Sequence, residues 1–248
     1  MNPEEYRVLY EQEDSFWWYR GMRAITATLI DRVIRPAKRG LCLDAGCGTG
    51  ANLRFLERWH DCLGFDLAPE AMSFLSKRGH FKVALASVEH IPFKDDSFDL
   101  VTVFEVILCS NNDRKALREI HRVTRPGGHV LIRESAFSLL SGEHDLATGL
   151  KGRYARGELE RKMRDAGFRL VWHSYVNFFL CFPILALRVF RRFFASRVRP
   201  TDAVSDFRFS PGLLNGLLER ILGLEAFWLR HGTFPFGVSI VAVGRKDR

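Results

Sequence analysis

Residues 41–51 read LCLDAGCGTGA, an apolar stretch followed at once by alternate glycines. A short apolar run of this kind is typical of a buried strand, and Gly46, Gly48 and Gly50 predict a tight turn where bare backbone can approach a ligand. A helix predicted over 52–58 would place unpaired N–H groups beside that turn. The segment therefore predicts a strand, a turn and a helix that together bind a nucleotide-like ligand.

Short apolar runs and helical periods alternate on both sides of this segment. Further strands are predicted at 62–65, 81–85, 98–104, 130–132, 168–175 and 237–244. Helices are predicted at 69–79, at 113–123 with Asp113 as its cap, and at 158–166, and residues 126–128 are expected to turn the chain before a strand. Alternation of this kind is the pattern of βαβ units, which predicts an α/β fold with a parallel sheet.

The composition is that of one globular domain covering residues 1–248, with 47% hydrophobic and 27% charged residues and a net charge of +8. The five cysteines contain no C-x-x-C spacing, which favours a reducing, cytoplasmic setting over a disulfide framework or a zinc cluster. The polar N-terminus and the lack of an apolar run of about 18 residues predict a protein that is neither secreted nor membrane-spanning.

Two carboxylates discriminate among nucleotide-like ligands. Asp66 ends the second predicted strand, a position from which a carboxylate accepts hydrogen bonds from ribose hydroxyls. Gly46, Gly48 and Ala51 also satisfy the G-x-G-x-x-G/A pattern of dinucleotide-binding turns, so an NAD-dependent oxidoreductase remains an alternative. Asp44, however, would repel a pyrophosphate and favours a ligand that carries positive charge.

The glycine-rich stretch resembles the corresponding motif of class I S-adenosylmethionine (SAM)-dependent methyltransferases, closest to the methyltransferase type 11 group that includes ubiquinone- and menaquinone-biosynthesis-like enzymes. The likeness extends through GFDLAPEAM at 64–72, IPF at 91–93, DSFD at 96–99, REIHRV at 118–123 and PGG at 126–128. It implies a Rossmann-like, doubly wound, mostly parallel seven-stranded sheet with an antiparallel last strand and a helical cap insertion. It also implies a SAM-binding core at 41–134.

The resemblance assigns most of the cofactor contacts. The glycine turn would surround the methionine part of SAM, with Cys47 contributing backbone only, while Asp66 would hold the ribose and Leu67 would flank the adenine. Ser87 stands where the family usually offers an Asp to the adenine amino group. The expected cofactor-binding residues are Asp44, Gly46, Cys47, Gly48, Gly50, Asp66, Leu67, Ser87, Val88, Phe104 and Arg20.

The flanking segments also resemble a subgroup of the family. FWWYR at 16–20 is similar to its aromatic N-terminal lid, here taken as a helical lid over 1–40, in which Trp17 and Trp18 are candidates to line the cofactor. The segments around 143–145 and 152–154 are similar to its loop after the fifth strand, where Arg153 and Tyr154 could orient a substrate oxygen or phosphate.

Methyl transfer from a sulfonium needs positioning more than a nucleophilic residue, although a general base helps where the acceptor is a hydroxyl or an acidic carbon. His144, Asp145 and Glu105 are the candidates for that base, with His144 preferred. No metal is assigned, because Leu108-Cys109 stands where relatives commonly read Glu-His.

Residues 176–232 form a predicted cap insertion. Positions 178–187 are apolar apart from a break at Pro183, and an arginine cluster follows. Its members are Arg188, Arg191, Arg192, Arg197 and Arg199. Such a segment could roof a pocket for a hydrophobic substrate or lie on an anionic membrane surface at the inner face of the membrane, and a plain cap helix with a solvated basic face remains an equal alternative.

These features together predict a metal-independent SAM-dependent methyltransferase that acts on a hydrophobic small-molecule or lipid-linked acceptor. A SAM- or lipid-binding module without catalysis is the main alternative, and the NAD-dependent oxidoreductase is a weaker one. Nucleic acid is not an expected substrate, because FEVI at 104–107 stands where base-flipping amino methyltransferases carry an Asn-Pro-Pro-Tyr type motif.

Overall fold

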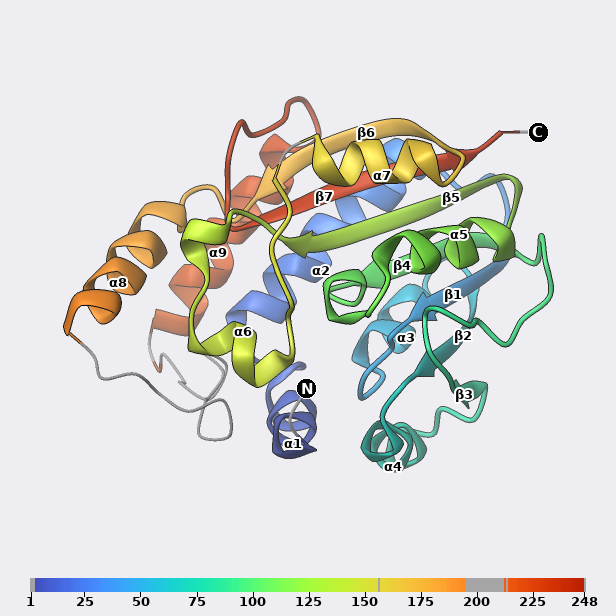
Figure 1. The fold of residues 1–248 in the computed structure, drawn as a ribbon, viewed down its shortest axis with the longest axis horizontal. Coiled ribbons are helices and arrows are strands. Elements are labelled where there is room, and N and C mark those ends of the chain that lie inside the picture. Colours follow the sequence, from blue (N-terminus) through green and yellow to red (C-terminus); the bar gives the residue numbers. More distant parts are fainter. Residues whose placement is uncertain (1–2, 156, 195–211, 213, 248) are drawn as a thin grey trace.

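The computed structural model describes residues 3–155, 157–194, 212 and 214–247 (Figure 1). The strands are β1 (Leu41–Ala45), β2 (Asp61–Asp66), β3 (Val83–Leu85), β4 (Phe98–Phe104), β5 (Thr124–Ser135), β6 (Phe168–Val176) and β7 (Ser239–Lys246). The α-helices are α1 (Pro3–Gln12), α2 (Trp17–Leu29), α3 (Ala51–Leu56), α4 (Pro69–Lys77), α5 (Asp113–Val123), α6 (Glu143–Thr148), α7 (Glu158–Asp165), α8 (Cys181–Phe194) and α9 (Leu214–Trp228). Shorter helical segments are η1 (Ile30–Ile34), η2 (Ile107–Cys109) and η3 (Ser138–Leu140).

The described strands form a single 7-stranded sheet in the order β3-β2-β1-β4-β5-β7-β6. Strands β1 to β5 pair in parallel, and β7 lies antiparallel between β5 and β6. The predicted doubly wound, mostly parallel sheet with an antiparallel last strand is therefore confirmed. Strand order reverses between β1 and β4, and ligands of such sheets bind at the carboxyl ends of the strands beside this reversal.

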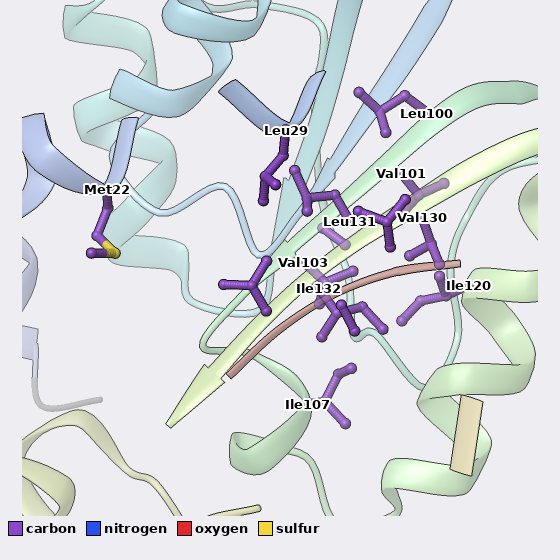
Figure 2. Close-up of a cluster of buried hydrophobic side chains, with 14 of the residues drawn as sticks. Met22, Leu29, Leu100, Val101, Val103, Ile107, Ile120, Val130, Leu131 and Ile132 are labelled. Carbon is purple, nitrogen blue, oxygen red and sulfur yellow. The ribbon is translucent and has the colours of Figure 1, made fainter. Parts of the chain in front are cut away.

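Helices cover both faces of the sheet and close a continuous apolar core (Figure 1). Figure 2 shows how Met22 and Leu29 of α2 and Ile120 of α5 approach side chains of β4 and β5. Leu29 and Ile120 are completely buried. Each such side chain contributes about 1.5–3 kcal/mol to the free energy of folding, so the central strands that carry the glycine turn rest on a rigid support.

The fifth strand begins earlier than predicted. Thr124 already pairs with Phe98, and the register shifts before His129 pairs with Leu100. Residues 126–128 therefore lie inside β5 as an irregularity in the ladder, and the prediction that they turn the chain ahead of a strand at 130–132 was wrong. A Pro-Gly-Gly sequence is compatible with such a bulge because glycine accepts the left-handed backbone, here with φ of +79° at Gly127.

The start of helix α5 also differs from the prediction. Asn112, not Asp113, caps α5, because its side chain accepts a hydrogen bond from the amide of Lys115 at 3.0 Å. Pro183, which interrupts the apolar stretch 178–187, is the third residue of α8. Proline is tolerated in the first turn of a helix, where its missing N–H would have no intrahelical partner.

Helices α2 and α9, which lie far apart in the sequence, pack together. At Gly21 of α2 an added Cβ would lie 2.3 Å from Cδ1 of Leu222, so the helices approach too closely for any side chain there. Glu225 of α9 is fully buried and accepts the amide of Phe179 at 3.0 Å, which ties the segment before α8 to α9. Part of the predicted cap thus packs on the N-terminal helices.

Candidate active site

The glycine turn follows β1 at the carboxyl edge of the sheet, as the sequence predicted. Gly46, Gly48 and Gly50 have φ values of +76°, +55° and +95°, a region of backbone space that side chains disfavour. A Cβ on Gly46 would also lie 2.3 Å from Cγ2 of Val106, which follows β4. The turn needs glycine both for its backbone conformation and for its close approach to the neighbouring loop.

The amides of this turn are already used within the protein. Gly46 and Cys47 both donate to the carbonyl of Phe65 at 2.9 Å, and Gly48 donates to Oδ2 of Asp66 at 2.9 Å. A dinucleotide fold binds its pyrophosphate through free amides at this position. These three amides are committed to β2 and are not free to bind a pyrophosphate.

Asp44 lies under the turn with one oxygen paired and one unpaired. Its Oδ1 accepts a hydrogen bond from Oγ1 of Thr102 at 2.7 Å, whereas no described group donates to its buried Oδ2. The residue is 1% exposed, and burial raises its pKa to about 6. An unpaired buried carboxylate oxygen is unfavourable, and a cationic ligand group such as the ammonium of methionine would satisfy it.

The residues expected to hold the nucleoside lie together at the ends of β2 and β3. Asp66 ends β2, which pairs with β3, and the amide of Ala86 donates to the Asp66 carbonyl at 2.9 Å. Ser87 and the buried Val88 follow β3 after one intervening residue, Ala86. Leu67 is 69% exposed, so its side chain is available to a planar ligand such as adenine. The arrangement fits the nucleoside part of SAM.

Helix α1 packs directly over this site. The hydroxyl of Tyr6 donates to Oδ1 of Asp66 at 3.0 Å, and a Cβ on Gly48 would lie 3.2 Å from Cδ2 of Leu9. After α1, Glu13 accepts a hydrogen bond from Thr49 of the turn. Burial, together with Asp66, raises the pKa of Tyr6, so its hydroxyl remains a donor at neutral pH. The first helix thus covers the glycine turn, as a lid would.

Oδ1 of Asp66 already accepts the Tyr6 hydroxyl and the amide of Ala68, each at 3.0 Å, so a ribose hydroxyl that binds this oxygen must compete with Tyr6. We therefore expect Tyr6→Phe to tighten binding of S-adenosylhomocysteine by about threefold to tenfold, which corresponds to roughly 0.7–1.4 kcal/mol. Titration calorimetry measures this change. Tyr10→Phe on the same helix is the control and should leave affinity unchanged, whereas weaker binding by Tyr6→Phe would mean that Tyr6 contacts the cofactor itself.

A second group of polar side chains gathers where β4 and β5 end. Glu105 directly follows β4 with φ of +60°, a strained value for a non-glycine residue, and its Oε2 accepts a hydrogen bond from Oγ of Ser135 at 2.9 Å. Burial raises the pKa of Glu105. The guanidinium of Arg133 lies 4.5 Å from the ring centre of Phe104 and 5.1 Å from that of Trp18.

Arg133 and Glu134 belong to this group, although the sequence reasoning missed both. Glu134 is completely buried, and its Oε1 accepts the amides of Val106 at 3.0 Å and Ile107 at 2.7 Å. Burial and the nearby Glu105 raise the pKa of Glu134 well above its usual range. The signal was present in the sequence, since two charged residues directly follow the apolar stretch 130–132.

The candidates on the loop after β5 have different environments. Asp145 was predicted as a base, but Arg153 binds it in a bidentate pair at 2.9 and 2.6 Å, and both side chains are buried. This pairing makes Asp145 a structural group, and Arg153 is likewise unavailable to a substrate. Tyr154 donates to Oδ2 of Asp113 at 2.9 Å and is buried. His144 remains the partly exposed candidate, on α6.

Arg20 does not lie at the cofactor turn. Its side chain is 50% exposed and pairs with Glu219 of α9 at 3.0 Å. Residues two apart on a helix point to roughly opposite sides, so Trp18 faces Arg133 while Arg20 faces α9. The assignment of Arg20 as a cofactor-binding residue was therefore wrong, whereas its neighbour Trp18 in the same motif reaches the site.

The predicted cap lies beside the loop that follows β5. Arg188 of α8 approaches Oδ1 of Asp145, with 3.9 Å between nitrogen and oxygen. Figure 1 shows α8 projecting from the body of the sheet beside α9. Of the predicted arginine cluster, Arg197 and Arg199 lie outside the described residues, as do the side chains of Arg191 and Arg192.

Across the described ranges, no group of three or more His, Cys, Asp or Glu side chains is arranged to hold a metal ion. The helices described in those ranges include none long and apolar enough to cross a bilayer.

Comparison with known proteins agrees with this geometry. A family described as "Methyltransferase domain" matches residues 43–132. Malonyl-[acyl-carrier protein] O-methyltransferase of Hamiltonella defensa is 32% identical over 133 residues, covering 53% of this chain and 49% of that protein. The Yersinia pestis protein of the same name is 29% identical over 198 residues, covering 77% of this chain and 62% of that protein. The first curated relatives are matched over about half of their length, from 48% to 54%.

Solved structures share the fold over nearly the whole chain. An S-adenosylmethionine dependent methyltransferase from Mesorhizobium loti superposes with a TM-score of 0.60 at 15% identity, covering 94% of this chain and 99% of that chain. At this level of identity the likeness concerns the fold alone. The match over residues 43–132 is thus to a methyltransferase domain, and the fold is shared with solved methyltransferase structures.

Proposed function

We propose that the protein binds SAM across the carboxyl edge of β1 and β2 and transfers its methyl group to a small-molecule or lipid-linked acceptor. The observation that carries the proposal is the buried, unpaired Oδ2 of Asp44 beneath the glycine turn. A carboxylate in this position complements the ammonium of the methionine part and repels a pyrophosphate. Asp66 would accept the ribose hydroxyls, and Leu67, Ser87 and Val88 would border the adenine.

SAM supplies a methyl group on a sulfonium, and the work of the protein is to align that methyl with the acceptor atom and exclude water. Glu105 and His144 are the remaining candidates for taking a proton from a hydroxyl or acidic carbon. Glu105 is the better placed of the two, because it directly follows β4 at the carboxyl edge of the sheet. A carboxylate acceptor would need no base.

Two observations support a hydrophobic or carrier-linked acceptor. The matched relatives from Hamiltonella defensa and Yersinia pestis are named for a malonyl group on an acyl-carrier protein. Helix α8, beside the loop that carries His144, exposes Phe182, Leu187 and Phe190. An apolar helix next to the acceptor side of the site is suited to guide a hydrophobic chain.

The proposal is tested by supplying SAM labelled on its methyl group to the purified protein with acceptors of separate classes. These are acyl thioesters with a free carboxylate, quinones and lipid-linked phenols. Label transfer to at least one class, with equal release of S-adenosylhomocysteine, is the expected result. Tight SAM binding without transfer to any acceptor would favour the non-catalytic module, and failure to bind SAM would overturn the proposal.

Contact with an anionic membrane is a separate proposal. Helix α9 exposes large apolar residues, with Phe227 60% exposed, and the exposed Arg220 lies on the same helix while the exposed Arg230 follows it. Aromatic and basic side chains on exposed helices favour the interface of an anionic bilayer. The exposed residues of α9 are Leu214, Leu217, Leu224, Phe227 and Trp228.

We expect the protein to sediment with vesicles that contain anionic phospholipid at low salt, and to be released as salt screens the attraction. Phe227→Ser should reduce the bound fraction severalfold. Phe81→Ser is the matched control, because Phe81 is 78% exposed just before β3, away from α8 and α9. Equal binding to neutral and anionic vesicles, or equal loss in both variants, would contradict the proposal.

A further inference from the structure

We infer that Arg133 binds the carboxylate of the methionine part of SAM, so that Asp44 and Arg133 hold the two ends of the amino-acid group. The inference rests on the proposed binding of SAM. It assigns a cofactor contact to a residue at the end of β5, on the far side of β4 from the glycine turn.

The register of the sheet places the two residues on one face. Asp44 pairs with Thr102, and two positions further along β4 Phe104 pairs with Arg133. Side chains two apart on a strand lie on the same face, so Asp44, Phe104 and Arg133 share the face that Trp18 of α2 covers. Arg133 therefore lies nearer the carboxyl edge than Asp44, on the path of a ligand that starts at Asp44.

The guanidinium of Arg133 is buried and oriented without a ligand, as expected of a cation that binds one. It is 7% exposed, and its buried Nε has no hydrogen-bond partner among the described residues. Its nearest carboxylate oxygen, Oε1 of Glu105, lies 3.9 Å from Nε, beyond hydrogen-bond distance. The aromatic rings of Trp18 and Phe104 fix the plane of the guanidinium without using its donors. A buried unpaired donor of this kind is unfavourable until an acceptor arrives.

The charged groups around Arg133 leave its Nε free to bind a ligand carboxylate. Its charged and titratable neighbours are Glu105, Glu134, Asp44 and Tyr19. Glu105 accepts from Ser135, and Glu134 is paired with backbone amides. Asp44 contributes the unpaired acceptor that complements the unpaired donor of Arg133. One buried free acceptor and one buried free donor match an ammonium and a carboxylate on a single zwitterionic group.

The assignment also explains why Arg20 is not needed. The aromatic lid motif carries its arginine toward α9, where it pairs with Glu219. The same motif sends Trp18 against Arg133. The cation at the site is thus supplied by β5 and oriented by the lid, which couples the position of α2 to recognition of the amino-acid end of the cofactor.

The test compares ligands that differ only at the amino-acid end. Calorimetry would measure S-adenosylhomocysteine, its carboxamide and methylthioadenosine, which lacks the amino-acid group, against the wild type, Arg133→Met and Arg20→Met. We expect Arg133→Met to weaken S-adenosylhomocysteine about 30-fold, equivalent to about 2 kcal/mol, and to leave methylthioadenosine within twofold. Methionine keeps an apolar side chain of similar length between the two rings.

The carboxamide provides a second comparison, which begins with the wild type. It should bind the carboxamide at least tenfold more weakly than S-adenosylhomocysteine, and Arg133→Met should bind the two equally. Arg20→Met should behave as the wild type. If Arg133→Met weakens all three ligands equally, the residue has a structural role and the inference is overturned. The inference is also overturned if the wild type binds the carboxamide as tightly as S-adenosylhomocysteine. If the wild type binds neither S-adenosylhomocysteine nor methylthioadenosine, the proposed function itself fails.

Discussion

Asp66→Ala is expected to weaken SAM binding by at least two orders of magnitude. Two ribose hydroxyls would donate to this carboxylate, and each hydrogen bond to a charged group contributes about 1.5–3 kcal/mol. The sum corresponds to roughly 100-fold or more in affinity. Asp66 also accepts the amides of Gly48 at 2.9 Å and Ala68 at 3.0 Å, so its removal loosens the turn that faces the methionine part as well. Titration calorimetry with SAM measures the loss.

Asp61→Ala provides the matched control for this variant. Asp61 begins the same strand, β2, and its exposed side chain pairs with Arg39 at 2.8 Å on the opposite edge of the sheet. We expect wild-type affinity from Asp61→Ala, and thermal unfolding should show that both variants are folded. If folded Asp66→Ala retained SAM binding, the result would contradict our assignment of the ribose hydroxyls to Asp66.

Asp44→Asn is expected to weaken SAM binding about 30-fold at pH 7.5 and to remove most of its pH dependence. Burial raises the pKa of Asp44 to about 6, and a cationic ligand binds only the charged form. Wild-type affinity should therefore fall as pH decreases through 6, by about tenfold for each further pH unit. Asparagine is always neutral, so its affinity should be low and nearly constant from pH 7.5 to 5.

Glu13 titrates in the same range and must be separated from Asp44. Burial raises its pKa to about 7, although it contacts Thr49 of the turn and Arg78 at 2.9 Å. Glu13→Gln should keep the decline of affinity below pH 6 that Asp44→Asn loses. A pH profile that is unchanged in Asp44→Asn and flat in Glu13→Gln would assign the titration to the lid and contradict our account of Asp44.

Much of the fold could be predicted because strand and helix patterns are local. The strand over 41–45, the glycine turn and the strand over 98–104 lie where their apolar periodicity indicated. Errors arose where tertiary pairing overrides local chemistry. Residues 126–128 carry strong turn residues, yet pairing with β4 includes them in β5, and no local signal reveals such a bulge. Cap positions likewise shift by one residue, as at Asn112.

The positions of candidate site residues were predictable where one strand end supplies the residue and less so where distant segments meet. Asp44 and Asp66 follow directly from their positions at the ends of predicted strands. Arg20 was misassigned because a motif gives the order of residues on a helix but not the face that packs on the sheet. The pairing of Asp145 with Arg153 joins residues eight apart, across the end of α6 and the loop after it, and no local pattern in the sequence indicates it. Arg133 was missed because its strand was expected to end one residue earlier.

The central claim is that the glycine turn binds SAM rather than a dinucleotide, and calorimetry on the wild-type protein tests it most directly. Separate titrations with S-adenosylhomocysteine and with NADH, each at pH 7.5, distinguish the two ligands at one site. We predict saturable binding of S-adenosylhomocysteine with one site per chain and no heat from NADH. Saturable binding of NADH, or a folded protein that binds no S-adenosylhomocysteine, would contradict the account.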